Sequence, residues 1–221
     1  MLYEDHLAFR YMRMASGNAR AQASGQASRP RAPQRERGRV RVSALLAAAA
    51  ALFAEKGYEA TTMTEIAARA GASIGTLYLF FPSKDVLAQT ILSETAEDLS
   101  AQLDALHART AGLSAVAIAD ALFAEIGSFL AKNPVYSILL DLPGHERWRR
   151  PVRARRRQQI AALFAEARPA LAAEKAERLA VIVPQLMRIA LTLDARDKLR
   201  DGILEELRLM LRHHLTAASA E

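Results

Sequence analysis

The segment 62–84 carries hydroxyl groups at spacings that suit contact with DNA. Ser73 and Thr76 can donate hydrogen bonds to bases or phosphates, and Tyr78 can donate its hydroxyl to a phosphate. Gly75 has no side chain, so the backbone there can approach a duplex closely. These residue types predict binding to a nucleic acid.

Apolar and basic residues extend this candidate surface. Ile74 and Leu79 could touch thymine methyl groups in a major groove. Arg39 and Arg41 follow a basic stretch and could contact the DNA backbone. The candidate DNA-binding residues are Arg39, Arg41, Thr62, Ser73, Ile74, Gly75, Thr76, Tyr78, Leu79 and Lys84.

The residues that catalysis or metal binding would need do not occur in a suitable pattern. The chain has no cysteine, which excludes disulfides, thiolate nucleophiles and cysteine-ligated zinc. His213 and His214 are adjacent, and so are His145 and Glu146, whereas two metal ligands on one helix face need the i, i+4 spacing. We therefore expect no enzyme activity, no metal and no cofactor.

Short helices with clear start and stop signals are expected to position the candidate residues. The spacing of apolar residues predicts a helix over 42–56. A second helix begins after a capping box made by Thr62 and Glu65. Gly71 permits the turn into a third helix, which Ser73 caps. This is the pattern of a helix-turn-helix, whose second helix enters the major groove by its N-terminal end.

A set of short motifs occurs in fixed order in this region: Gly57-Tyr58, Thr62 with Glu65, Ile66-Ala67, Ala70-Gly71-Ala72-Ser73, Gly75-Thr76-Leu77-Tyr78 and Phe81-Pro82-Ser83-Lys84. At these residues the chain resembles the TetR family of transcriptional regulators, over roughly residues 38–90. The resemblance implies phosphate contacts by Tyr78 and Lys84. It also implies a homodimer whose helical C-terminal half binds a small molecule.

Composition and charge agree with a helical protein that binds a polyanion. Only 10 glycines and 8 prolines occur in 221 residues, which favours helices over strands. The net charge of +6 favours a polyanionic partner. No apolar run is long enough to span a membrane, and no signal peptide is recognisable, so we expect a cytoplasmic protein.

The expected fold class is all-α, in three parts. Residues 1–37 are expected to be a disordered basic arm, because the composition of 15–33 cannot bury a core. Residues 38–84 form a three-helix DNA-binding domain with the helix-turn-helix at 62–81. Residues 85–221 form a C-terminal helical bundle for effector binding and dimerisation.

Large apolar residues are spread over the C-terminal half, and the family resemblance implies an effector pocket among them. Tyr136 and Trp148 are the strongest candidates because each adds a polar group to an apolar wall. Packing in an ordinary core is the alternative for every candidate. The arginine run 147–157 is expected to be a solvated helix face, with an anionic ligand or a second stretch of DNA as alternatives. The candidate pocket residues are Phe123, Ile126, Phe129, Tyr136, Trp148, Phe164 and Met187.

The last two expected helices, over 170–193 and 197–216, carry apolar stripes. The resemblance implies that this pair packs against its twin as a four-helix bundle. The candidate interface residues are Leu179, Val183, Leu186, Ala190, Ile203, Leu207 and Met210.

The sequence therefore predicts a ligand-responsive repressor that binds a palindromic operator as a homodimer. Its expected partners are double-stranded DNA and an unknown, largely apolar small-molecule effector. An activator or a ligand-independent regulator of the same fold is the first alternative. A small-molecule-binding protein without DNA contact is the second.

Overall fold

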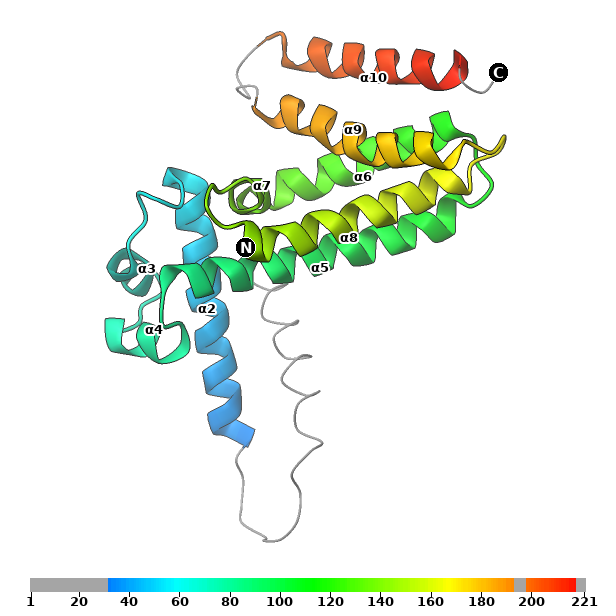
Figure 1. Ribbon diagram of the computed structural model, residues 1–221. Coiled ribbons are helices and arrows are strands. Elements are labelled where there is room, and N and C mark those ends of the chain that lie inside the picture. The colour runs from blue at the N-terminus through cyan, green and yellow to red at the C-terminus, as the bar shows by residue number, and fades with distance from the viewer. Residues whose placement is uncertain (1–31, 193–197, 218–221) are drawn as a thin grey trace, which may run out of the picture. The chain divides into compact units, whose positions relative to one another are not determined.

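A computed structural model describes residues 32–192 and 198–217 (Figure 1). Within these ranges the chain is helical with short connections and contains no strand, which confirms the expected all-α fold. No helix in the described ranges is long and apolar enough to cross a membrane. In chain order the helices are α2 (Ala32–Lys56), α3 (Met63–Arg69), α4 (Ile74–Phe80), α5 (Lys84–Thr110), α6 (Ala115–Lys132), α7 (Pro134–Leu140), α8 (Glu146–Ala165), α9 (Ala173–Thr192) and α10 (Arg200–Ala217).

The first of these helices begins earlier than expected. We expected a disordered arm up to residue 37, but residues 32–37 are helical. Pro33 lies in the first turn of α2, where its missing amide hydrogen costs no hydrogen bond. The glutamine, glutamate and arginines that follow are good helix formers. The remainder of the expected arm, 1–31, lies outside the described residues.

The described chain forms two compact units. Unit 1 contains α2, α3, α4, α7 and the first part of α5, up to Glu94. Unit 2 contains α5 from Thr95 onward, together with α6, α8, α9 and α10. The boundary expected at residue 84 therefore differs from this division. The first turns of α5 belong to unit 1, where Leu87 and Ile91 are fully buried.

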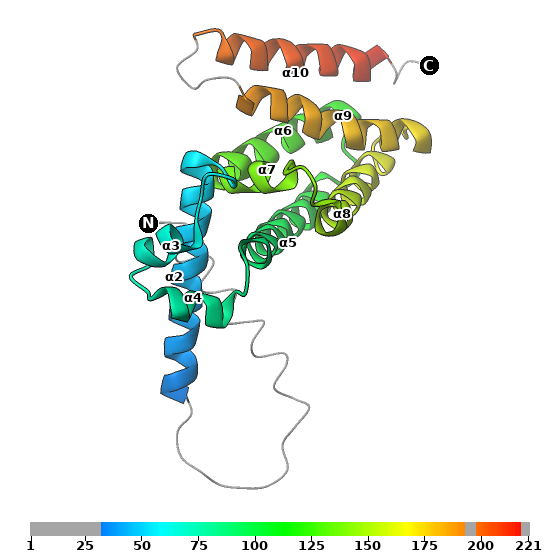
Figure 2. The same cartoon turned by 60° about the vertical axis from the view of Figure 1, so that its left-hand side comes forward.

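Unit 1 is built around α2, whose residues 45–50 are all buried. Leu45, Leu46 and Phe53 are fully buried, and both α3 and α7 pack against α2. Figures 1 and 2 show α3 and α4 beside α2, with the N-terminal turns of α2 running on past α4. The long helix is thus the frame that positions the two short ones.

Unit 2 is a helical bundle in which α6 contacts α8, α9 and α10. A Cβ atom built on Gly127 of α6 would lie 3.2 Å from Cε of Met187 on α9, so the missing side chain lets these helices approach closely. Arg208 and Arg212 of α10 form ion pairs with Asp120 of α6, at 3.0 and 2.7 Å.

The predicted pocket residues divide between the two units. Trp148 is half-buried, and its ring centroid lies 5.2 Å from that of His145. Tyr136 lies on α7 in unit 1, whereas the other candidates lie in unit 2. The effector pocket stays a prediction. The buried candidates are Phe123, Ile126, Phe129, Tyr136, Phe164 and Met187.

The predicted dimer residues differ widely in exposure. Leu179 and Val183 are buried inside their own unit, so they offer no surface to a second chain. The side chain of Ala190 lies outside the described residues. The remaining candidates are Leu186, Ile203 and Leu207, which are partly exposed, and Met210, which is 65% exposed.

Candidate nucleic-acid interface

One side of α4 is buried and the other faces solvent. Leu77 is fully buried and attaches the helix to the rest of unit 1. Ile74, Tyr78 and Leu79 are 40%, 50% and 79% exposed. Within the described residues, no hydrogen bond or ion pair involves the Tyr78 hydroxyl. The side chains that we expected to face DNA are therefore accessible from outside the chain.

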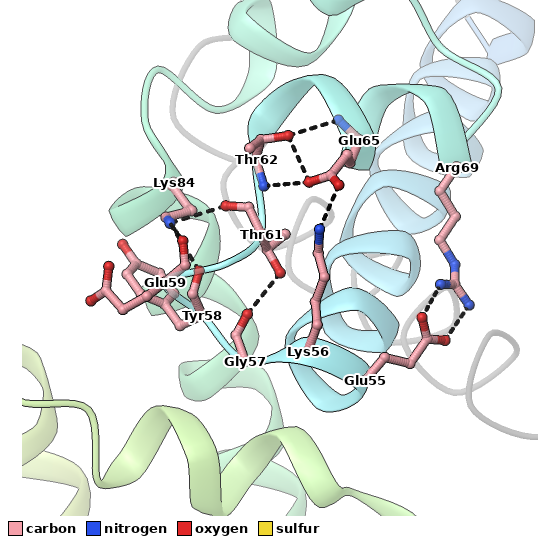
Figure 3. Close-up of polar contacts among 10 residues, drawn as sticks. All are labelled: Glu55, Lys56, Gly57, Tyr58, Glu59, Thr61, Thr62, Glu65, Arg69 and Lys84. Carbon is pink, nitrogen blue, oxygen red and sulfur yellow. Dashed lines mark hydrogen bonds and ion pairs between the residues drawn. The ribbon is translucent and has the colours of Figure 1, made fainter.

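The capping box at the start of α3 is confirmed, but it occupies Thr62. The Glu65 amide donates to Thr62 Oγ1 at 3.3 Å, and the Thr62 amide donates to Glu65 Oε2 at 2.9 Å (Figure 3). Thr62 Oγ1 also donates to Glu65 Oε2 at 2.7 Å. Both donors of Thr62 therefore point at a carboxylate. The phosphate contact expected of Thr62 has no free donor, and the Glu65 charge would repel a phosphate there.

Ser73 caps α4 as expected. The Thr76 amide donates to Ser73 Oγ at 3.1 Å, and the two hydroxyl oxygens lie 2.8 Å apart. Either hydroxyl can be the donor in the second contact, so one hydroxyl hydrogen stays available to an external acceptor. This pair keeps the hydrogen-bonding capacity that the sequence predicted.

Ion pairs hold α3 on α2. Lys56 Nζ lies 2.5 Å from Glu65 Oε1, and Arg69 donates from two nitrogens to Glu55 at 2.5 and 2.6 Å (Figure 3). The hydrogen bond from Lys56, followed by those from Thr62, lowers the pKa of Glu65 to about 2. Exposed pairs of this kind each contribute little to stability. Their larger effect is on binding, because Lys56 and Arg69 already have anionic partners.

Lys84, for which the family resemblance implied a phosphate contact, already has acceptors within the chain. Its Nζ donates to the carbonyl oxygens of Tyr58, Glu59 and Thr61, at 2.9, 3.3 and 3.0 Å (Figure 3). The same atom lies 4.2 Å from the centroid of the Tyr58 ring. A lysine ammonium has three N–H donors, so the chain itself uses all of them. Lys84 thus fixes the connection between α2 and α3, and its contact with a phosphate stays a prediction.

Tyr58 completes this structural cluster. Its ring is buried and lies 5.3 Å, centroid to centroid, from the ring of Phe53. Its hydroxyl donates to Asp85 Oδ1. Burial, and then the hydrogen bond to Asp85, raise the pKa of Tyr58, so the phenol stays neutral. The motifs Gly57-Tyr58 and Phe81-Pro82-Ser83-Lys84 contain both residues, but the contact between them could not be predicted from the sequence.

Two glycines shape α4 for different reasons. Gly71 has a φ of +62°, a conformation that L side chains rarely adopt, so the turn between α3 and α4 requires glycine. Gly75 has no positive φ, and a Cβ atom there would meet only Ser73 Oγ, at 4.0 Å. Neither the backbone nor packing within the chain requires a glycine at position 75. A glycine at position 75 would still be needed if another molecule approaches the backbone closely there.

The two predicted arginine contacts lie on the N-terminal half of α2. Arg41 is exposed and Arg39 is partly exposed. Figures 1 and 2 show that this part of α2 projects beyond α4. Their contact with DNA stays a prediction.

Comparison with known proteins agrees with this geometry. Residues 45–91, which cover the helix-turn-helix, match the family described as bacterial regulatory proteins, tetR family. A stretch of 100 residues is 32% identical to the HTH-type transcriptional repressor KstR of Mycolicibacterium smegmatis. Over this segment the chain is similar to the TetR family. The match to KstR covers 45% of this chain and about half (48%) of that repressor.

Solved TetR-type structures share the fold over most of the chain. A TerR/AcrR-family transcriptional regulator from Aquifex aeolicus VF5 is 22% identical and superposes with a TM-score of 0.60, covering 79% of this chain and 99% of that one. FadR from Bacillus subtilis, solved in complex with stearoyl-CoA, is 18% identical, with a TM-score of 0.56 and coverage of 74% and 96%. The likeness includes the C-terminal helices that the sequence motifs do not reach.

Proposed function

We propose that the protein is a transcriptional repressor that binds a palindromic operator as a homodimer and releases it when a small molecule binds. The observation that carries the proposal is the exposed side of α4, where Ile74, Tyr78 and Leu79 face away from the chain. The match of residues 45–91 to the TetR family and the resemblance to KstR support it. On this reading, α4 enters the major groove and Tyr78 binds a phosphate.

The exposed apolar residues of α9 and α10 support a homodimer. These helices contact each other and carry large apolar side chains on their outer faces, where a second chain would cover them. Pairing would also supply the second recognition helix that a palindrome requires. The residues proposed for this interface are Val181, Ile182, Ile189, Leu209 and Met210.

Support for the response to a ligand comes from a structural neighbour. The structural neighbour FadR was solved with stearoyl-CoA, and unit 2 has the helical fold that this neighbour shares. A ligand can release DNA only if it binds more tightly to the conformation that does not fit the operator.

The test is binding to the DNA upstream of the protein's own gene, measured by fluorescence anisotropy at several salt concentrations. Tyr78→Phe removes one hydroxyl and keeps the ring, and a lost hydrogen bond to a charged group costs about 1.5–3 kcal/mol. We expect roughly tenfold or greater weakening with unchanged helicity by circular dichroism. Thr216→Val, which removes an exposed hydroxyl from α10, should bind as the wild type does. Equal affinity for unrelated DNA, or full affinity in Tyr78→Phe, would contradict the proposal.

A further inference from the structure

A buried arginine in unit 2 has donors that no protein group satisfies. Arg149 of α8 is only 4% exposed, yet neither its Nε nor its Nη1 has a hydrogen-bond partner. Its Nη2 donates to Glu146 Oε1 at 2.6 Å. Burying charged donors without acceptors is costly, and a guanidinium cannot relieve the cost by losing its proton. The arrangement is therefore suited to an acceptor from outside the chain.

Arg149 shares its carboxylate partner, Glu146, with a second arginine. Arg153 Nη1 also lies near Glu146 Oε1, at 3.6 Å, so two guanidinium groups share one carboxylate. The side chain of Glu146 is 64% exposed, which weakens its attraction through solvent screening. Glu146 therefore compensates the buried charge of Arg149 only in part, which favours an additional anion.

The start of α8 adds further donors at the same place. Because Arg149 reaches Glu146, its guanidinium lies beside the first turn of the helix. His145, the N-cap residue, makes no side-chain hydrogen bond to the amides of that turn. Uncapped amides and the helix dipole both favour an anion at a helix N-terminus. Two independent features, a buried unpartnered arginine and an uncapped helix start, thus converge.

We propose that the first turn of α8 binds the anionic head group, a carboxylate or a phosphate, of a small molecule, with Arg149 as its principal contact. That this molecule is the effector rests on the proposed function. Binding of the anion itself does not depend on DNA. The run 147–157, expected to be a solvated face, is therefore not uniformly exposed. Arg149 is buried, whereas Arg147 and Arg150 are exposed.

The test uses Trp148, the only tryptophan of the chain, as a fluorescent reporter beside Arg149. The full-length protein is titrated with octanoate, octyl phosphate and uncharged octanol. We expect a saturable response to at least one anionic probe and none to octanol, and the two anions distinguish the carboxylate from the phosphate. Arg149→Gln should weaken that binding roughly tenfold or more, because it removes hydrogen bonds to a charged group. Arg150→Gln, a change at the exposed neighbour, should bind within about twofold of the wild type.

Stability without ligand separates binding from a purely structural role. Arg149→Met removes the unsatisfied donors and keeps an apolar stem, so it should melt at the same temperature as the wild type or higher. A structural arginine would give a lower melting temperature in this variant. The proposal is overturned by that result, by equal responses to octanol and the anions, by no response to either anion, or by unchanged binding in Arg149→Gln. A wild type that binds the anion but no DNA would overturn the proposed function and leave this site standing.

Discussion

Replacing Gly75 by alanine should stabilise the protein and weaken its binding to DNA. Gly75 lies inside α4 with no positive φ, and the added Cβ would meet only Ser73 Oγ, at 4.0 Å. The chain therefore gains helix propensity without a clash. The same methyl group would stand on the surface that we propose enters the major groove. The melting temperature should therefore rise while the affinity for DNA falls.

The two magnitudes can be stated separately. Glycine in a helix is less favourable than alanine by roughly 0.5–1 kcal/mol, and the lower end applies in the first turn of α4. For a chain of this size, about 0.5 kcal/mol raises the melting temperature by roughly 1–2 °C. A methyl group forced into a close-packed interface costs about 1–3 kcal/mol. The dissociation constant should therefore rise roughly fivefold to 150-fold.

Thermal unfolding by circular dichroism measures the first effect, and anisotropy with the labelled operator measures the second. Gly202→Ala is the matched control, because Gly202 also lies in a helix, α10, with no positive φ and no atom within 4 Å of a built Cβ. It should stabilise the fold similarly and leave DNA binding unchanged. Gly75→Ala with unchanged operator affinity would show that the α4 backbone does not approach DNA closely. A loss of stability in that variant would show that the chain itself needs the glycine.

Two further changes test the framework that carries α4. Lys84→Met removes three hydrogen bonds to carbonyl oxygens and should destabilise the protein by about 1–2 kcal/mol in thermal unfolding. It should leave the slope of log affinity against log salt unchanged, whereas loss of a phosphate contact would reduce that slope by about 0.9. Glu65→Gln tests the carboxylate whose pKa falls from 4.5 to about 2 in the folded chain. Because the pKa of Glu65 is lower in the folded chain, its ionised form adds to the free energy of unfolding above pH 4.5, and this contribution is lost as the pH falls toward 2. The urea midpoints of wild type and variant should therefore differ near neutral pH and converge below pH 4.5. A constant difference across this range would exclude the ionised Glu65 as the cause.

Local interactions made the recognition segment predictable from sequence. The caps of α3 and α4 join residues three positions apart, so the types of Thr62, Glu65 and Ser73 were sufficient to place both helix starts. The positive φ of Gly71 follows equally from its place in a turn. Sequence reasoning works here because each partner is fixed by the helix geometry itself.

Partners distant in sequence were not predictable in the same way. Lys84 and the carbonyl oxygen of Tyr58 are separated by 26 positions, and backbone carbonyls carry no sequence signal. The partner of the apolar stripe on α9 was also not predictable. The helical spacing of its apolar residues predicted that Leu179 and Val183 would be buried, but not whether their own chain or a second chain would cover them. The structure shows that their own unit does.

The free cationic donors that would bind phosphates do not come from the residues that hold α3 and α4 in place. Lys56, Arg69 and Lys84 all bind acceptors within unit 1. The exposed arginines Arg37 and Arg41 instead lie on α2, whose N-terminal turns project beyond α4 (Figures 1 and 2). Phosphate attraction is largely independent of base sequence, whereas base edges are read by groups within the groove. The fold therefore separates the two tasks: arginines on α2 would supply affinity, and the uncharged exposed side of α4 would supply sequence preference.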